Sequence, residues 1–131
     1  ANTTTGGETM KRDWDVMRLI LVTMEEQPSA SFSLFPRDFS PVDGETVAYH
    51  LRLLKKGGYV EGADRDMPGV PPEESFIAMG LTLEGHDLAE TLKSKALWAR
   101  IKTIVREKGI ALTFDTVKIV AAHAVKFLLE K

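Results

Sequence analysis

Hydrophobic residues recur at helical spacing near the start of the chain and predict a first helix from about Asp13 to Glu26. Val16, Leu19 and Ile20 line one side of this helix, and further apolar residues widen that side. Pro28 ends the helix, because proline disfavours the helical conformation in the residue before it. An apolar surface this broad indicates a helix that other elements cover.

The next periodic stretch, SPVDGETVAYHLRLLKKGGYVEG (residues 40–62), predicts a helix followed by a turn and a strand. Ser40 is expected to cap the helix, with Pro41 at its first position and Asp43 at its third. Gly57 and Gly58 end it, because glycine adopts the left-handed conformation of a helix end at little cost. The buried side of this helix is predicted to consist of Val47, Leu51 and Leu54.

Three short apolar segments predict a small antiparallel sheet formed by Phe32–Leu34, Tyr59–Ala63 and Phe76–Leu83. The segment between the second and third strands is rich in proline and glycine, which predicts a loop without regular structure. The helix, the turn and the returning strands together indicate a winged-helix module, with this loop in the position of the wing.

Three more helices are predicted after the sheet, at Glu84–Lys93, Lys95–Lys108 and Phe114–Glu130. Thr82 is expected to cap the first of them, Gly109 to end the second and Thr113 to cap the third. The last helix is apolar over most of its circumference, which predicts that more than one of its sides is buried.

These elements predict a single domain that is mostly α with a small antiparallel β-sheet (α+β), a winged-helix variant with two extra C-terminal helices. A charge introduced at Leu51 is expected to prevent folding, because an unpaired charge in a core costs several kcal/mol, order of magnitude. The predicted core consists of Val16, Leu19, Ile20, Val47, Leu51, Leu54, Val60, Ile77, Leu81, Leu88, Leu92, Ile101, Val105, Val117, Val120 and Leu128.

Four stretches of the chain resemble one protein family: MKRDWDVMRLIL (residues 10–21), VAYHLRLLKKGGYVEG (47–62), LTLEGHDLAETL (81–92) and KGIALTFDTVK (108–118). In these stretches the chain is similar to DUF2513, a family of small phage and prophage proteins of unknown function. The pieces AYHLRLL and LTLEGHD are the most specific. The resemblance implies a winged-helix-like fold and a phage or prophage origin, and it implies no activity because the family name carries none.

Composition adds limits on location and chemistry. The 131 residues are 44% hydrophobic and 27% charged, as in an ordinary globular domain. The sequence has no cysteine, which excludes disulfides and thiolate zinc sites and fits a cytoplasmic location. No apolar run reaches the roughly 20 residues that cross a bilayer, so no membrane association is expected.

Residues 1–9 are small and polar and show no periodicity. We expect them to be a leader added before a native start at Met10, so that the single domain covers residues 10–131.

The exposed side of the central helix presents Tyr49, Arg52 and Lys56, together with Glu45, as a candidate nucleic-acid-binding face. Arginine and lysine neutralise phosphates, arginine also reads guanine, and tyrosine can stack on bases. The alternative is an ordinary solvated helix surface. Replacing Arg52 and Lys56 by alanine is expected to leave the stability nearly unchanged, because substitutions of exposed residues usually have small effects.

A second basic patch follows later in the chain and is either an alternative electrostatic footprint or a solvated surface. It consists of Lys93, Lys95, Arg100, Lys102 and Arg106. The wing-like loop and its flanks are acidic, with five carboxylates against one arginine, and the formal net charge is −2. Acidic side chains repel a phosphate backbone, so the loop and the net charge weigh against nucleic-acid binding.

The three histidines, His50, His86 and His123, lie far apart in the sequence, so structural roles are expected and no metal site is predicted. The sequence contains no glycine-rich phosphate loop, nucleophile elbow or HExxH motif. We therefore predict no enzyme activity and no cofactor.

Two functions stay open at this point. The first is a nucleic-acid-binding, regulator-like module, which the winged-helix resemblance and the Tyr49, Arg52 and Lys56 face favour. The second is a protein–protein interaction or dimerisation module that does not bind DNA, which the near-neutral charge and the acidic loop favour. The apolar last helix predicts a homodimer, and its burial within the C-terminal layer of one chain is the alternative.

Overall fold

The structure is a computed structural model that describes residues 11–29 and 31–129, with side chains described as far as residue 126. The expected leader, Glu130 and the side chain of Leu128 therefore lie outside the described residues. In chain order the elements are α1 (Trp14–Glu25), α2 (Gly44–Lys56), β1 (Val60–Asp64), β2 (Phe76–Leu81), α3 (Leu83–Leu92), α4 (Lys95–Lys108) and α5 (Phe114–Leu129). Helices with a two-stranded antiparallel sheet confirm the predicted α+β class.

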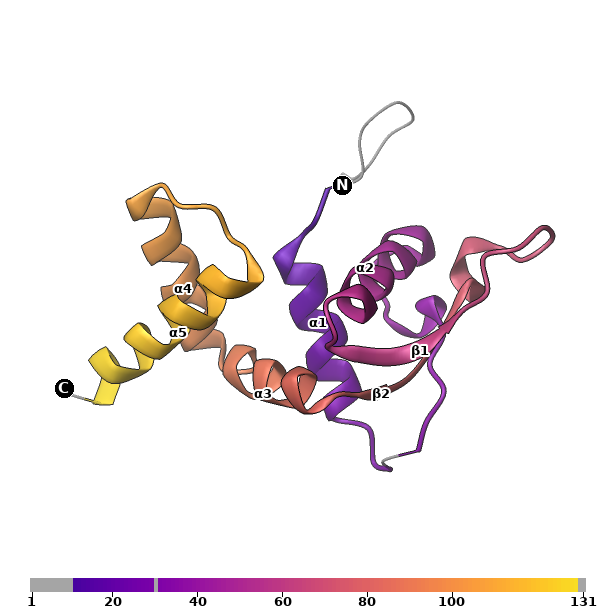
Figure 1. Ribbon diagram of the computed structural model, residues 1–131, viewed down its shortest axis with the longest axis horizontal. Helices are drawn as coiled ribbons and strands as arrows, with labels where there is room; N and C mark the ends of the chain where they lie inside the picture. Colours follow the sequence, from indigo (N-terminus) through magenta and orange to yellow (C-terminus); the bar gives the residue numbers. More distant parts are fainter. Residues whose placement is uncertain (1–10, 30, 130–131) are drawn as a thin grey trace.

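Helix α1 occupies the middle of the molecule (Figure 1). Helix α2 and the sheet lie on one side of it, while α4 and α5 form a separate layer on the other side. Helix α3 packs against α1 and leads from the sheet into α4. The loop between β1 and β2 and the C-terminal end of α5 therefore lie at opposite ends of the molecule (Figure 1).

The sheet is smaller than predicted. Strands β1 and β2 pair in antiparallel register from Val60 opposite Leu81 to Asp64 opposite Phe76. The predicted strand Phe32–Leu34 is reduced to a single bridge, in which Leu34 and Ala78 exchange backbone hydrogen bonds of 2.9 and 2.8 Å. The strand cannot continue because a 3₁₀ turn follows at Pro36–Asp38.

Helix α2 begins later than predicted. Asp43 is the residue before the helix rather than its third residue, and its carboxylate accepts a hydrogen bond from the backbone amide of Thr46 at 3.0 Å. This carboxylate satisfies an amide that has no partner within the helix, so the helix starts at Gly44 and the predicted cap at Ser40 was wrong. At the other end Gly58 adopts a φ of +84°, whereas Gly57 stays in the right-handed region.

The loop between β1 and β2 contains one turn of 3₁₀ helix, at Pro72–Glu74, where no regular structure was predicted. Proline fits the first position of such a turn because it needs no amide hydrogen. The amides of Glu74 and Ser75 close the turn by donating to the carbonyls of Pro71 and Pro72.

The three C-terminal helices confirm the prediction to within a residue at their described ends. The hydroxyl of Thr82 accepts from the amide of Gly85 at 3.0 Å, and that of Thr113 accepts from the amide of Thr116 at 3.1 Å. Gly109 ends α4 in the left-handed conformation, with a φ of +65°. Local capping chemistry thus determines these boundaries.

Most predicted core residues are buried, but Leu19, Ile77 and Leu81 are only half-buried. Leu51 is fully buried, as the predicted core requires. Aromatic residues missing from the predicted core contribute much of its volume. They are Trp14, Phe39, Tyr59, Phe76 and Trp98.

The first half of α1 holds the C-terminal helices in place through side-chain hydrogen bonds. The indole of Trp14 donates to the carbonyl of Leu112 in the α4–α5 connection at 2.7 Å. The guanidinium of Arg18 donates to the carbonyls of Leu92 and Lys93, at 2.6 and 2.9 Å, where α3 ends. Helix α1 is therefore shared by both sides of the molecule.

No helix within the described residues is long and apolar enough to cross a membrane.

Candidate functional site

Arg52, the central residue of the predicted nucleic-acid-binding face, is engaged within the chain. Its Nε and Nη2 atoms donate to the two carboxylate oxygens of Asp64 on β1, at 2.9 and 3.2 Å. Nη2 also lies 3.2 Å from the carbonyl oxygen and 3.1 Å from the hydroxyl oxygen of Ser75. Arg52 therefore ties α2 to the base of the β1–β2 loop. The hydrogen bonds that it donates to Asp64 lower the pKa of the Asp64 carboxyl.

The other two residues of this face differ in exposure. Tyr49 is half-buried, and its ring meets the ring of His50 edge-on with centroids 5.2 Å apart. Lys56 is exposed in the last turn of α2. The three predicted residues thus lie on one helix, but of its two cationic residues only Lys56 is exposed. The sequence did not reveal the engagement of Arg52, because its partners are 12 and 23 residues away.

The acidic β1–β2 loop also forms ion pairs within the chain. Glu74 pairs with Arg37 at 3.2 Å. The guanidinium of Arg37 lies over the ring of Phe35, 4.6 Å from its centroid, and Arg65 approaches the same ring at 5.9 Å. Part of the negative charge of the loop is therefore offset by arginines around Phe35.

The residues of the second basic patch lie at the end of α3 and along α4, and two of them form ion pairs. Lys93 pairs with Glu90 at 3.0 Å, and Lys102 pairs with Asp15 of α1 at 3.2 Å. Lys95, Arg100 and Arg106 are exposed. Two of the predicted patch residues thus form ion pairs: that of Lys93 lies at the end of α3, and that of Lys102 joins α4 to α1.

His50 is completely buried at the junction of α1 and α2. Its Nε2 accepts a hydrogen bond from the backbone amide of Asp13 at 2.8 Å, so Nδ1 carries the proton and donates to the Thr46 carbonyl at 2.8 Å. Burial lowers the pKa of His50, and the hydrogen bond to Thr46 and the nearby Asp13 carboxylate oppose this shift. His50 thus has the structural role expected for it.

His86 and His123 are exposed, and His86 lines a pocket of about 300 Å³ with Phe32, Met79 and other residues at the end of α1. Within residues 11–29 and 31–129, no group of three or more histidine or carboxylate side chains is arranged to hold a metal ion.

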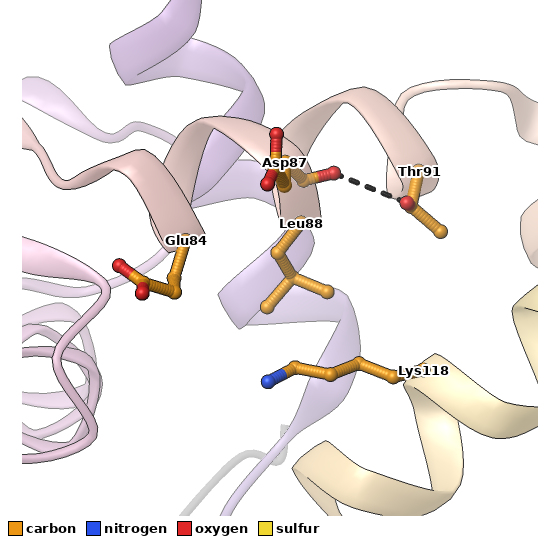
Figure 2. A pocket seen from close by; sticks show the side chains of 5 residues that line it. All are labelled: Glu84, Asp87, Leu88, Thr91 and Lys118. Carbon is orange, nitrogen blue, oxygen red and sulfur yellow. Dashed lines mark hydrogen bonds between the residues drawn. The ribbon is translucent and has the colours of Figure 1, made fainter.

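A smaller pocket of about 190 Å³ lies between α3 and α5 (Figure 2). Glu84, Asp87 and Thr91 line it from α3, Leu88 forms its apolar side, and Lys118 reaches across from α5. The Thr91 hydroxyl donates to the carbonyl of Asp87 at 3.1 Å. This volume and the mixture of charges suit a polar side chain of a partner better than a large ligand.

Lys118 is also placed by an aromatic ring. Its amino group lies 5.1 Å from the centroid of the Tyr59 ring, and hydrogen bonding with Tyr59 raises the pKa of Lys118. The Tyr59 ring in turn stacks on Phe114, the first residue of α5, with centroids 4.6 Å apart. The first turn of α5 is thereby fixed against the turn between α2 and β1.

Helix α5 presents apolar residues on two sides. Its buried side faces α4 and consists of Val117, Val120, Ala121 and Ala124. On the other side Ile119 is 69% exposed and Val125 is 38% exposed, and Ala122 is exposed between them. The sequence predicted the apolar circumference of this helix, but only the structure separates the buried side from the exposed one.

Comparison with known proteins tests the family resemblance of the chain. The family model described as "Hypothetical protein (DUF2513)" matches residues 11–111. An "Uncharacterized protein" of Haemophilus influenzae is 38% identical over 120 residues, which is 92% of this chain and 99% of the relative. No solved structure gives a significant match. Because the family match extends from the start of α1 to the α4–α5 connection, this chain belongs to the DUF2513 family.

Proposed function

We propose that this protein is a non-catalytic protein-interaction module that forms homodimers through α5. The observation that carries the proposal is the exposed apolar side of α5, where Ile119 keeps 69% of its surface accessible. A helix whose buried side already packs on α4 gains nothing within the chain from a second apolar side. Exposed apolar surface of this kind favours association with another protein surface.

Electrostatics support a protein partner over nucleic acid. The Arg52 guanidinium is held by Asp64 and Ser75, so using it on a phosphate would break an ion pair within the chain. Lys93 and Lys102 also have carboxylate partners. The formal net charge of −2 adds no general attraction for a polyanion.

Nucleic-acid binding is the second candidate function, in a regulator-like role. The observation that favours it is the placement of Lys56 and Tyr49 on α2, which the β1–β2 hairpin follows in the chain. In this role the loop of the hairpin would serve as the wing. On this alternative Lys56 contacts phosphate, and the exposed Lys95 and Arg106 of α4 form a separate site.

One pair of measurements separates the two functions. Sedimentation of the wild-type protein at tens of micromolar should reveal a dimer, because specific dimers of ordinary affinity are populated at such concentrations. Fluorescence anisotropy with mixed DNA and RNA at about 50 mM salt should reveal no binding, although electrostatic binding is strong there. A strict monomer would refute the proposed function, and salt-dependent binding lost in Lys56→Ala would establish the alternative.

We also propose a cytoplasmic location and a phage or prophage origin. The absence of cysteine from the sequence supports a reducing compartment. The resemblance to a phage-associated family supports the origin. Fractionation of the host cell and the identity of the neighbouring genes would test these two expectations.

A further inference from the structure

We infer that α5 pairs antiparallel with the α5 of a second copy through a stripe of four exposed residues, Asp115, Ile119, Ala122 and Lys126. This inference rests on the proposed function, because it specifies how the homodimer is assembled.

Spacing places these residues on one side of the helix. They follow one another at intervals of four, three and four residues, which is the spacing of the contact stripe between two packed helices. All are exposed, whereas Val117, Val120, Ala121 and Ala124 between them are buried against the rest of the chain. The stripe is therefore available to a partner without any change in the fold.

Charge makes the stripe complementary to itself in only one direction. Asp115 and Lys126 stand at its two ends, roughly 16 Å apart along the axis at 1.5 Å per residue. In an antiparallel pair centred between Val120 and Ala121, Asp115 of each copy faces Lys126 of the other, and Ile119 faces Ala122. A parallel pair would instead bring Asp115 against Asp115 and Lys126 against Lys126, which is unfavourable.

This self-complementarity is the reason for choosing a second copy as the occupant. A two-fold interface requires that the same patch meet itself with residue i against j and j against i, and the stripe meets that requirement. The small side chain of Ala122 opposite the larger Ile119 allows the two helices to approach closely. Opposed helix dipoles add a favourable contribution in the antiparallel arrangement.

The stripe is short compared with a standard interface of roughly 800 Å² per partner, so a dimer in the micromolar range is expected rather than a tight one. Sedimentation over a concentration series measures its dissociation constant. The substitution Ile119→Asp should raise that constant at least tenfold while leaving the circular dichroism spectrum unchanged, because the side chain is largely exposed. Leu83→Asp is the matched control, since Leu83 is 74% exposed but lies on α3.

A charge exchange tests the direction of the pair. Asp115→Lys and Lys126→Asp should each weaken the dimer several-fold, because each creates like-charge contacts across the interface. The double variant Asp115→Lys/Lys126→Asp should recover the wild-type dissociation constant. Each substitution also opposes the helix dipole, because it puts a positive charge near the start of α5 or a negative charge near its end. These two unfavourable effects add up in the double variant, so a recovered dimer cannot come from a more stable helix.

The outcomes separate this inference from the proposed function. A wild-type monomer would refute both of them. A wild-type dimer that is indifferent to Ile119→Asp, equally weakened by Leu83→Asp, or not restored by the double charge exchange would refute only the α5 stripe.

Discussion

At the scale of single residues, His50 is a polar side chain enclosed in the core. It is fully buried, and both ring nitrogens are used, one accepting from the Asp13 amide and the other donating to the Thr46 carbonyl. Protonation of Nε2 would leave the Asp13 amide facing a second donor. The imidazole is therefore neutral in the folded chain at neutral pH and joins the start of α1 to α2.

The first prediction is that acid destabilises the protein through His50. Its pKa lies below the usual 6.5 in the folded chain, so the unfolded chain takes up the proton first as the pH falls. The free energy of unfolding should be constant above about pH 7 and fall below about pH 6.5 by up to about 1.4 kcal/mol per pH unit. The decrease should stop once the pH reaches the folded pKa. Urea unfolding at a series of pH values measures this slope.

His50→Asn and His123→Asn provide the comparison. The first should be less stable at pH 7 by about 1–3 kcal/mol and should lose most of the slope between pH 7 and 5. The second replaces an exposed ring and should keep both the stability and the slope. An unchanged slope in His50→Asn would mean that other groups cause the acid sensitivity.

Gly85 is the second critical residue at this scale. It lies in the first turn of α3 directly against the backbone carbonyl of Tyr59, and an added Cβ atom would overlap the carbonyl oxygen. The same carbonyl accepts the amide of Thr82, the residue that caps α3, at 3.1 Å. Close packing of two backbones, rather than a special dihedral angle, therefore requires glycine here.

The second prediction follows from this contact. Alanine normally stabilises a helix by about 1 kcal/mol relative to glycine, but Gly85→Ala should destabilise the protein by about 1–3 kcal/mol because of overpacking. Gly80→Ala is the control, because its Cβ atom would meet only the mobile end of Glu61, at 3.3 Å. Thermal unfolding of both variants compares them, and a more stable Gly85→Ala protein would contradict the close approach.

At the scale of elements, Arg52 links α2 to the hairpin. It bonds to Asp64 at the end of β1 and to Ser75 just before β2, so one side chain fixes both ends of the β1–β2 loop. From the sequence alone, replacing Arg52 and Lys56 was expected to leave the stability nearly unchanged. The contacts of Arg52 with Asp64 and Ser75 change that expectation for Arg52 only.

The third prediction therefore compares two substitutions on one helix. Arg52→Ala should cost about 1–2 kcal/mol, since it removes an ion pair and hydrogen bonds to the buried Ser75. Lys56→Ala should change the free energy of unfolding by no more than about 0.5 kcal/mol. Urea unfolding measures both changes in the free energy of unfolding. Urea is chosen because guanidinium chloride is a salt and would screen the ion pair. Equal effects would contradict a structural role of Arg52.

The comparison of elements also explains how far the sequence could lead. Helices α3, α4 and α5 were predictable because Thr82, Gly109 and Thr113 act on amides and turns within a few residues. The start of α2 was misplaced because Ser40 and Asp43 both fit a cap, and only folding decides between them. The third strand and the engagement of Arg52 depend on partners far along the chain, which periodicity does not identify.

At the scale of the whole molecule, α1 connects the two layers, which also contact each other directly where Tyr59 stacks on Phe114. Arg18 of α1 donates to the last carbonyls of α3, where a positive charge also suits the helix dipole. Trp14 and Asp15 hold the α4–α5 connection and α4 itself through hydrogen bonds to Leu112 and Trp98. We expect the two layers to unfold together for this reason.

The fourth prediction tests that cooperativity at a fixed protein concentration. Unfolding transitions followed by far-ultraviolet circular dichroism and by tryptophan fluorescence should coincide. Arg18→Met should lower the free energy of unfolding derived from both transitions by about 1–3 kcal/mol, because it leaves carbonyls at the end of α3 without their donor. Arg37→Met, which removes an exposed ion pair with Glu74, should lower this free energy by less than about 1 kcal/mol. Separate transitions would mean that the layers are independent.

The placement of α5 far from the β1–β2 loop has a consequence for valency (Figure 1). Two copies joined by α5 would carry their hairpin loops at the two outer ends of the assembly, both unobstructed. A partner with repeated sites could then be held by both loops at once, and the second contact would form at a high effective concentration. Weak binding by one loop would in this way become strong binding by the pair, and a substitution in α5 would abolish it without touching either contact.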